Sequence, residues 1–306
     1  MKQNFFMLWV KELRAPFLTA SVIPVLLGAA IAWSQGIPFS WGLFALTLIG
    51  GVLMHAGVNV ANDYFDHKSG TDDINVDFVS PFTGGSRMIQ EGLLKPRDVL
   101  IGSLILLTAA SIIGIYLTFI RGYFILLLGI VGIFSGFFYT APPFRMAHVG
   151  LGELLVGLNF GILMTLGSYY VQTGSFNIEP VLASVPVALL ITAVLYINQF
   201  QDYAADKAVG KNNLVVMLGK KRARIGYVIL ILTTYIWILV TVILRNISPF
   251  TALSLLTVPI AVGAIKTLLA NYDRIEELAP ANAGTIMLHA SLGLILSVAY
   301  LLDKLL

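Results

Sequence analysis

The sequence predicts an all-α protein that crosses a membrane many times. Of its 306 residues, 58% are hydrophobic and only 11% are charged, and the mean hydropathy is +0.87. Soluble domains average about 25% charged residues, so this chain has too few ionic groups to cover a surface in water. Its apolar composition also excludes a disordered chain.

The apolar residues fall into about nine segments, each near the roughly 20 residues that a membrane-spanning helix requires. Gly and Pro occur inside several of these segments, which membrane helices tolerate. A short amphipathic turn around Trp9 precedes the first segment. Arg14 at its edge is interpreted as a membrane anchor in preference to a residue that contacts phosphate. We expect residues 1–306 to form one integral-membrane domain. In chain order, the expected spans are 15–35, 39–66, 98–119, 123–141, 149–172, 179–202, 223–245, 248–270 and 282–303.

The basic residues predict how the chain is oriented. With nine spans, all but three of the 19 Lys and Arg residues lie on the side that holds the N-terminus, the exceptions being Arg121, Arg245 and Lys304. Basic loops stay in the cytoplasm during membrane insertion. We therefore expect a multi-pass cell-membrane protein whose N-terminus and long polar loops are cytoplasmic.

Other counts exclude several classes of function. The chain has no Cys, which excludes disulfides, a thiolate zinc site and a catalytic Cys. Its four His residues argue against a His-rich metal centre. A net charge of +3 is too small to indicate a nucleic-acid partner.

Two acidic clusters end two of the expected spans on the N-terminal side. In the first, Asn62 and Asp66 are four residues apart and share a helix face. In the second, Asn198, Asp202 and Asp206 form a stripe at the same spacing. Carboxylates at membrane depth need partners, and their oxygens suit Mg²⁺, which shares its coordination shell with substrate phosphates. The two stripes therefore predict a site that binds Mg²⁺ together with a diphosphate.

Two alternatives stay open at this point. Each Asp, taken singly, is equally well explained as a solvated residue at a helix end. The similarity of Asn59-x-x-x-Asp63-Tyr to Asn198-x-x-x-Asp202-Tyr would also make Asp63, rather than Asp66, the ligand.

At these clusters the chain resembles the UbiA superfamily of intramembrane prenyltransferases, whose two motifs are NDxxDxxxD and DxxxD. Asn62-Asp63-Tyr-Phe-Asp66 is similar to the start of the first motif, and Asp202-x-x-x-Asp206 to the second. Gly70 replaces the third acid of the first motif, and Asp72 and Asp73 follow it. This variant resembles the menaquinone-type branch, which prenylates 1,4-dihydroxy-2-naphthoate. Asp72 or Asp73 would then supply the carboxylate oxygen that Gly70 lacks.

Three further stretches resemble the same branch. They are Tyr139-Thr-Ala-Pro-Pro-Phe-Arg145, Gly150-Leu-Gly-Glu153 and Gly210-Lys211-Asn-Asn-Leu214. The similarity extends from Arg14 to about Gly219, and the order and spacing of its motifs are more specific than DxxxD alone.

The resemblance implies nine helices around a central cavity and Mg²⁺-dependent transfer of a polyprenyl group, through an allylic carbocation, to an aromatic or quinone-precursor acceptor. It implies catalytic roles for Asp66, Asp202, Asp206 and Tyr139. The Tyr139 ring would face the carbocation, although a Tyr of the interfacial aromatic belt is an equal alternative. The prenyl tail requires an apolar tunnel that opens to membrane lipid. The implied metal ligands are Asn62, Asp66, Asp72, Asn198, Asp202 and Asp206.

The diphosphate also needs basic partners. Besides Tyr139, the resemblance and the positions of the loops suggest Lys68, Arg87, Arg145 and Lys211 as substrate-binding residues. For each of these cations the alternative is a loop residue that only fixes the orientation in the membrane.

Other functions remain as alternatives. Within the superfamily, the acceptor could instead be 4-hydroxybenzoate or geranylgeranylglyceryl phosphate. A protein of a different class, an ion-coupled transporter, could use the Asp stripes as ion sites. Transporter repeats are often inverted, whereas both stripes here lie on one side of the membrane, which favours the enzyme.

Overall fold

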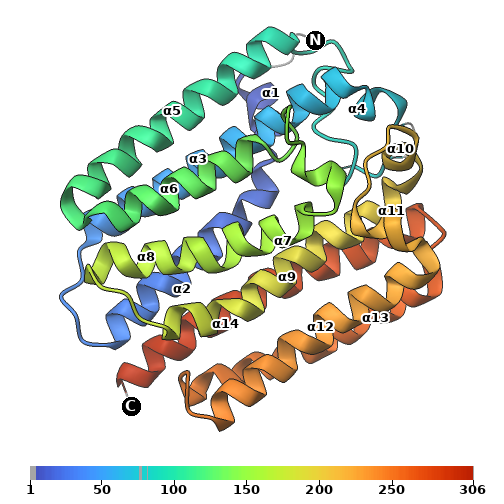
Figure 1. The fold of residues 1–306 in the computed structure, drawn as a ribbon. Helices are drawn as coiled ribbons and strands as arrows, with labels where there is room; N and C mark the ends of the chain where they lie inside the picture. The colour runs from blue at the N-terminus through green and yellow to red at the C-terminus, as the bar shows by residue number, and fades with distance from the viewer. Residues whose placement is uncertain (1–4, 76–77, 81, 306) are drawn as a thin grey trace.

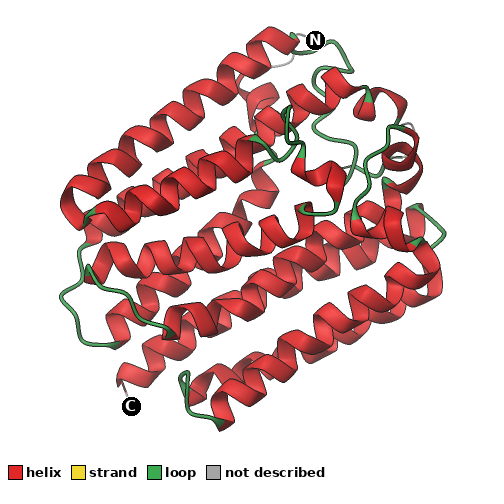
Figure 2. Ribbon diagram, viewed as in Figure 1, coloured by secondary structure: helices red, strands yellow, loops and turns green. Residues whose placement is uncertain are grey.

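The computed structural model describes residues 5–75, 78–80 and 82–305. Within these ranges all regular secondary structure is helical (Figure 2). The long helices run side by side as one bundle, and the two ends of the chain lie at opposite ends of it (Figure 1). An odd number of crossings produces this arrangement.

The expected number of spans is confirmed in the described part of the chain. It contains eight helical segments that are long and apolar enough to cross a membrane, and one shorter apolar helix at Tyr123–Phe137. The spanning segments are α2 (Thr19–Ser34), α3 (Trp41–Ser69), α5 (Pro96–Arg121), α6 (Tyr123–Phe137), α7 continued by α8 (Gly152–Gly157 and Met164–Thr173), α9 (Glu179–Gln201), α12 (Lys220–Ile243), a 3₁₀ helix at Pro249–Thr257 continued by α13 (Val258–Asn271), and α14 (Ala279–Leu305).

Two spans differ from their expected bounds for local reasons. Helix α6 ends at Phe137, short of the expected residue 141, because the chain turns ahead of Pro142 and Pro143. Helix α14 begins at Ala279 instead of residue 282. Pro280 fits in its first turn, because the backbone N–H that proline lacks would have no partner within the helix at that position.

Four short helices gather at the end of the bundle that holds the N-terminus (Figure 1). They belong to the polar loops that the sequence placed on this side of the membrane. They are α1 (Phe5–Glu12), α4 (Thr71–Ile74), α10 (Tyr203–Ala208) and α11 (Leu214–Leu218).

The main apolar core lies between α2, α9, α12 and α14. Leu27, Leu190, Ile231 and Leu292, one from each of these helices, are almost wholly enclosed. By contrast, α5 exposes residues such as Ile105 and Ile112 on its outer face. In a bilayer these side chains contact lipid, as do those of Ile229 and Ile236 on the outer face of α12.

Small residues bring the helices of the core into close contact. A Cβ atom at Gly161 would lie 2.5 Å from Cα and 2.7 Å from the backbone N of Ala188, on α9. A Cβ at Gly28, on α2, would lie 2.2 Å from the carbonyl oxygen of Thr165. Membrane helices associate largely through such close packing, since burial from lipid brings little hydrophobic gain.

The fifth span is not a regular α-helix. A π-helical segment, Leu158–Leu163, separates α7 from α8. Such segments add a residue to one turn and are frequent at functional sites. Here the segment carries Asn159 and Phe160, which line both cavities described below.

The close contact at Gly161 predicts the effect of adding one methyl group. We expect Gly161→Ala to lower the free energy of unfolding by about 1–3 kcal/mol, because the backbone of Ala188 cannot move aside without strain. Thermal unfolding in detergent measures this loss. Gly263→Ala is the matched control, since nothing lies within 4 Å of a Cβ at that helical position. Equal stability of the two variants would contradict this account of the packing.

Candidate active site

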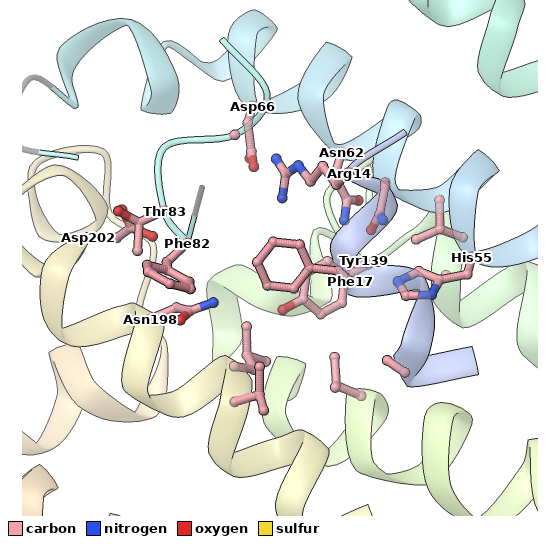
Figure 3. A pocket seen from close by; sticks show the side chains of 18 of the residues that line it. Arg14, Phe17, His55, Asn62, Asp66, Phe82, Thr83, Tyr139, Asn198 and Asp202 are labelled. Atoms are coloured by element: carbon pink, nitrogen blue, oxygen red, sulfur yellow. The ribbon is translucent and has the colours of Figure 1, made fainter. Parts of the chain in front are cut away.

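A cavity of about 220 Å³ opens among the helix ends and loops at the N-terminal end of the bundle. Its polar side chains come from segments far apart in the sequence, and Figure 3 shows five of them, Arg14, Asn62, Asp66, Asn198 and Asp202, around one space. The charged and carboxamide side chains of the lining are Arg14, Asn59, Asn62, Asp66, Asp72, Asn75, Asn159, Asn198, Asp202, Asp206 and Lys211.

Helix α3 contributes Asn62 and Asp66 from its last two turns. The Oδ1 atom of Asn62 accepts a hydrogen bond of 2.9 Å from Thr140 Oγ1, which fixes the amide. The Oδ1 atom of Asp66 is enclosed and has no hydrogen-bond partner among the described residues. A carboxylate oxygen left unpaired in this way strongly favours a cation beside it.

Asp63 occupies a different environment, which distinguishes the two alternatives for the first cluster. It is 3% exposed, forms an ion pair with Arg14, and accepts a hydrogen bond of 3.1 Å from the backbone N–H of Ser86. Ser86 Oγ also donates to the buried carboxyl of Glu12. Asp63 thus fastens the loop before Arg87 to the protein, whereas Asp66 lines the cavity.

The structure also separates Asp72 from Asp73. Asp72, on α4, is 6% exposed and lines the cavity. Asp73 points away from it and contacts His67 Nδ1 and Gln90 Nε2, both at 3.2 Å. Asp72 is therefore the residue placed to substitute for the acid that Gly70 replaces.

The second acidic cluster meets the first directly. Asn75 Nδ2, at the end of α4, donates a hydrogen bond of 2.7 Å to Asp202 Oδ1. Asp202 follows the last residue of α9, and Asp206 lies one turn further on in α10. The two segments that the sequence placed on one side of the membrane hence form the walls of a single cavity.

Asn198 also lines this cavity, but its amide oxygen is already in use. Asn282 of α14 is fully buried and donates a hydrogen bond of 2.7 Å to Asn198 Oδ1. A carbonyl oxygen has two lone pairs, so one remains for a ligand. This bond ties the second cluster to the last helix.

Lys211 places a cation against the second cluster. Its Nζ lies 3.3 Å from Asp206 Oδ1. The segment that follows is fixed by Glu153, whose Oε1 accepts hydrogen bonds from Gln199 Nε2 at 2.8 Å and from the backbone N–H of Leu214 at 2.9 Å. Glu153 therefore has a packing role in positioning this loop.

The cavity holds more negative than positive charge, and this changes how its groups titrate. Burial, followed by the charges of Asp66 and Asp63, raises the pKa of Asp72 to about 8. Burial likewise raises the pKa of Asp206. Burial alone would lower the pKa of Lys211, but Asp206 and the other carboxylates raise it well above its usual range.

Three of the basic residues expected to bind diphosphate do not line this cavity. Lys68 and Arg145 are exposed, because the last turn of α3 and the turn before residue 146 point them outward. Arg87 donates to the backbone oxygens of Asp72 and Asn75 and stacks on Phe78. It holds in place the segment that presents Asp72, which is a positioning role.

Sequence reasoning also missed residues that the cavity does contain. Arg14, interpreted as an anchor, faces it (Figure 3). Its location at the edge of the first span resembles that of any interfacial cation, so no local signal separates the two roles. Asn75 lies in an irregular segment without a pattern to reveal it.

Tyr139 and His55 line the deeper, less polar wall (Figure 3). The hydroxyl of Ser21 donates its hydrogen to Leu18 O at 2.8 Å. Its oxygen can therefore only accept from His55 Nδ1, 3.3 Å away. In this tautomer the lone pair of His55 is on Nε2, which has no hydrogen-bond partner in the described part of the chain.

These residues fit a divalent cation that is shared with a ligand. In the described ranges, no three His, Asp or Glu side chains are close enough to hold a metal alone. Yet Asp66, Asp72, Asp202 and Asp206 face one cavity, and Asp66 has an unpaired oxygen. Mg²⁺ commonly takes one or two carboxylates and completes its shell with water and phosphate oxygens.

A second cavity, of about 200 Å³, lies beside the first and is lined almost entirely by apolar residues of α3, α5, α6 and α8. The two share His55, Val58, Gly136, Asn159 and Phe160. We call the second cavity the apolar chamber and these five residues its mouth.

Comparison with known proteins agrees with this geometry. The model of the UbiA prenyltransferase family matches residues 21–292, and the chain belongs to this family. It is an integral membrane protein and a prenyltransferase.

The relatives and solved structures that it resembles cover nearly its whole length. It is 30% identical to the 1,4-dihydroxy-2-naphthoate octaprenyltransferase of Bacillus subtilis, over 94% of this chain and 89% of that one. It is 27% identical to the 2-carboxy-1,4-naphthoquinone phytyltransferase of Synechocystis, over 96% and 92%. A UbiA homolog from Archaeoglobus fulgidus, solved with geranyl diphosphate and Mg²⁺, superposes with a TM-score of 0.68 at 16% identity, over 98% of this chain and all of that one.

The raised pKa of Asp72 predicts how the stability of the metal-free protein depends on pH. The folded state binds more protons than the unfolded state between about pH 4, the ordinary Asp pKa, and about pH 8. The free energy of unfolding therefore falls as pH rises through this window, by at most about 1.4 kcal/mol per unit for one such group.

Thermal unfolding in detergent with a chelator, at pH 5 and pH 8, measures this dependence. We expect Asp72→Asn to make it shallower and Asp73→Asn, at the exposed neighbour, to leave it unchanged. Stability that rises toward pH 8 would contradict the expectation.

Proposed function

We propose that this protein transfers a long prenyl group from a prenyl diphosphate to 1,4-dihydroxy-2-naphthoate, with Mg²⁺, at the cytoplasmic surface of the cell membrane. The observation that carries the proposal is the convergence of the two acidic segments on one cavity whose mouth opens into an apolar chamber. A diphosphate with a long apolar tail has these same two parts. We also propose that residues 1–306 act as one domain.

The acidic wall would bind the diphosphate. Asp66, Asp72, Asp202 and Asp206 would hold Mg²⁺, with the amide oxygens of Asn62 and Asn198 beside them, while Lys211 and Arg14 contact phosphate oxygens directly. When bound, the metal supplies charge neutralisation to the leaving diphosphate. The number of carboxylates relative to basic groups in the cavity supports this assignment, since several buried acids without cations repel one another.

The deeper wall would hold the reacting carbon and the acceptor. As the C–O bond to diphosphate breaks, positive charge develops on the allylic carbon, and the Tyr139 ring lies where it could stabilise that charge. Apolar neighbours such as Phe17, Val58 and Phe160 exclude water, which would otherwise consume the cation. The acceptor ring would then form the new C–C bond, and the attacked ring carbon would release a proton, or CO₂ if it bears the carboxylate, to restore aromaticity.

His55 is suited to orient a hydroxylated ring. In the tautomer described above its free lone pair is on Nε2, and the residue lines the wall of the cavity beside Tyr139. A neutral imidazole accepts a hydrogen bond from an aromatic hydroxyl. This feature and the naphthoate relatives favour a dihydroxynaphthoate acceptor.

The proposed orientation rests on the distribution of basic residues. The end of the bundle that holds α1, α4, α10 and α11 also holds nearly all Lys and Arg residues, and such loops remain in the cytoplasm. The charged diphosphate group of the donor and the water-soluble acceptor would be available on that side.

A direct assay tests the function. We expect purified protein with Mg²⁺ and an octaprenyl or geranylgeranyl diphosphate to prenylate 1,4-dihydroxy-2-naphthoate in preference to 4-hydroxybenzoate or geranylgeranylglyceryl phosphate. Adding a chelator should abolish turnover, and Mg²⁺ should restore it. Preferential use of another acceptor would overturn the naphthoate assignment, and turnover that persists with chelator would overturn the metal requirement.

Removing single carboxylates tests the acidic wall. We expect Asp202→Asn and Asp206→Asn each to lower kcat by more than about 100-fold, because a lost metal contact costs several kcal/mol of transition-state stabilisation and about 1.4 kcal/mol corresponds to tenfold. Asp73→Asn, outside the cavity, should stay within about twofold of wild type. Near wild-type rates in both cavity variants would refute the assignment.

A further inference from the structure

The apolar chamber has no free polar group beyond its mouth. Its two hydroxyl side chains are both satisfied by backbone: Thr47 Oγ1 donates to Leu43 O at 2.8 Å, and Ser168 Oγ donates to Val25 O at 2.7 Å. At the mouth, Asn159 Nδ2 donates to Leu155 O at 2.8 Å. An occupant of the chamber therefore needs no polar atoms and would gain no hydrogen bond by having them.

Part of the chamber exists because side chains are missing at three wall positions. A Cβ atom on Gly114 of α5 or on Gly129 of α6 would have nothing within 4 Å, and one on Gly132 would meet only Met54 Cε at 3.9 Å. Other glycines of the wall are tightly packed: a Cβ at Gly51 would lie 2.8 Å from Met164 Cε. Close helix contact thus explains Gly51 but not the three open positions.

Glycine at these three sites is costly without a function. In the interior of a helix it is about 1 kcal/mol less favourable than alanine. No neighbour prevents a larger residue there, so the benefit must come from the space itself.

The chamber runs deep along the bundle. Its lining extends on α3 from Val58 to Thr47 and on α6 from Gly136 to Ile125. At 1.5 Å per residue, each stretch is about 16 Å long, roughly half the thickness of the hydrocarbon layer. Gly129 lies more than halfway from the mouth at Gly136 to the far end at Ile125.

We propose that Gly114, Gly129 and Gly132 determine which prenyl chain lengths the enzyme accepts, by leaving room for the isoprene units of a long polyprenyl diphosphate that lie within the chamber, beyond those of a short donor. This inference rests on the proposed function and specifies its donor. Continuity with the acidic cavity decides the occupant: a tail attached to a diphosphate at Asp66 and Asp202 enters the chamber through its mouth. Gly129 lies about 10 Å along α6 from the mouth at Gly136, so a larger residue there would affect length selection more than the reacting carbon.

Filling the open space tests the inference. For wild type and for Gly129→Leu, kcat/KM is measured with geranyl diphosphate and with octaprenyl diphosphate. We expect kcat/KM of Gly129→Leu with the octaprenyl donor to fall at least about tenfold below wild type, since overfilling an apolar site costs about 1–3 kcal/mol. Its value with geranyl diphosphate should stay within about threefold of wild type. Gly114→Leu should act in the same direction.

Gly263→Leu is the matched control, because its Cβ position is equally open but lies on α13, away from the chamber. It should not change the ratio of the two donors. If Gly129→Leu changes this ratio no more than Gly263→Leu does, or lowers turnover of both donors equally, the inference is wrong. Should the leucine variant fail to fold in a thermal unfolding assay, Gly129→Ala provides the same comparison with a smaller expected change.

These measurements distinguish a failure of this inference from a failure of the proposed function on which it rests. Wild type that transfers no prenyl group to any aromatic acceptor would overturn the proposed function. In that event the binding of the two diphosphates, measured by the shift in unfolding temperature with Mg²⁺, still decides the inference. If the inference is correct, octaprenyl diphosphate no longer raises the unfolding temperature of Gly129→Leu, whereas geranyl diphosphate raises it as in wild type.

Discussion

The organisation of this protein depends on one electrostatic constraint: several carboxylates are buried close together where a membrane bundle opens to water. Two like charges 4 Å apart repel by about 4 kcal/mol at an effective dielectric constant of about 20. The chain balances only part of this charge, through Lys211 beside Asp206 and Arg14 beside Asp63. The remainder favours a cationic partner, which Mg²⁺ bound together with a diphosphate would supply.

A second group of residues keeps this arrangement rigid without contacting the ligand. Asp63 and Glu12 hold the loop at Ser86, Arg87 holds the backbone at Asp72, and Glu153 holds the segment after Lys211. Each is an acid or a base that satisfies backbone or hydroxyl groups of a loop. The charged residues around the cavity thus form two groups. One group lines the cavity, and the other holds the loops that surround it.

The sequence predicted most of the fold and half of the detail of the site. Spans could be located because twenty apolar residues leave few alternatives, and the stripe of Asn198, Asp202 and Asp206 because helical spacing is fixed. The choices between Asp63 and Asp66, and between Asp72 and Asp73, depend on which way one helix is rotated and on where a loop turns. Lys68 and Lys211 have the same local character, and only tertiary contacts bring Lys211 to Asp206. Arg14 was missed because its neighbours in space are distant in sequence.

The π-helical segment at Leu158–Leu163 has a consequence for how such enzymes diversify. One residue more or fewer in that turn would rotate one half of the helix relative to the other by about 100°. Evolution can therefore exchange the side chains that separate the two cavities through a single-codon insertion or deletion.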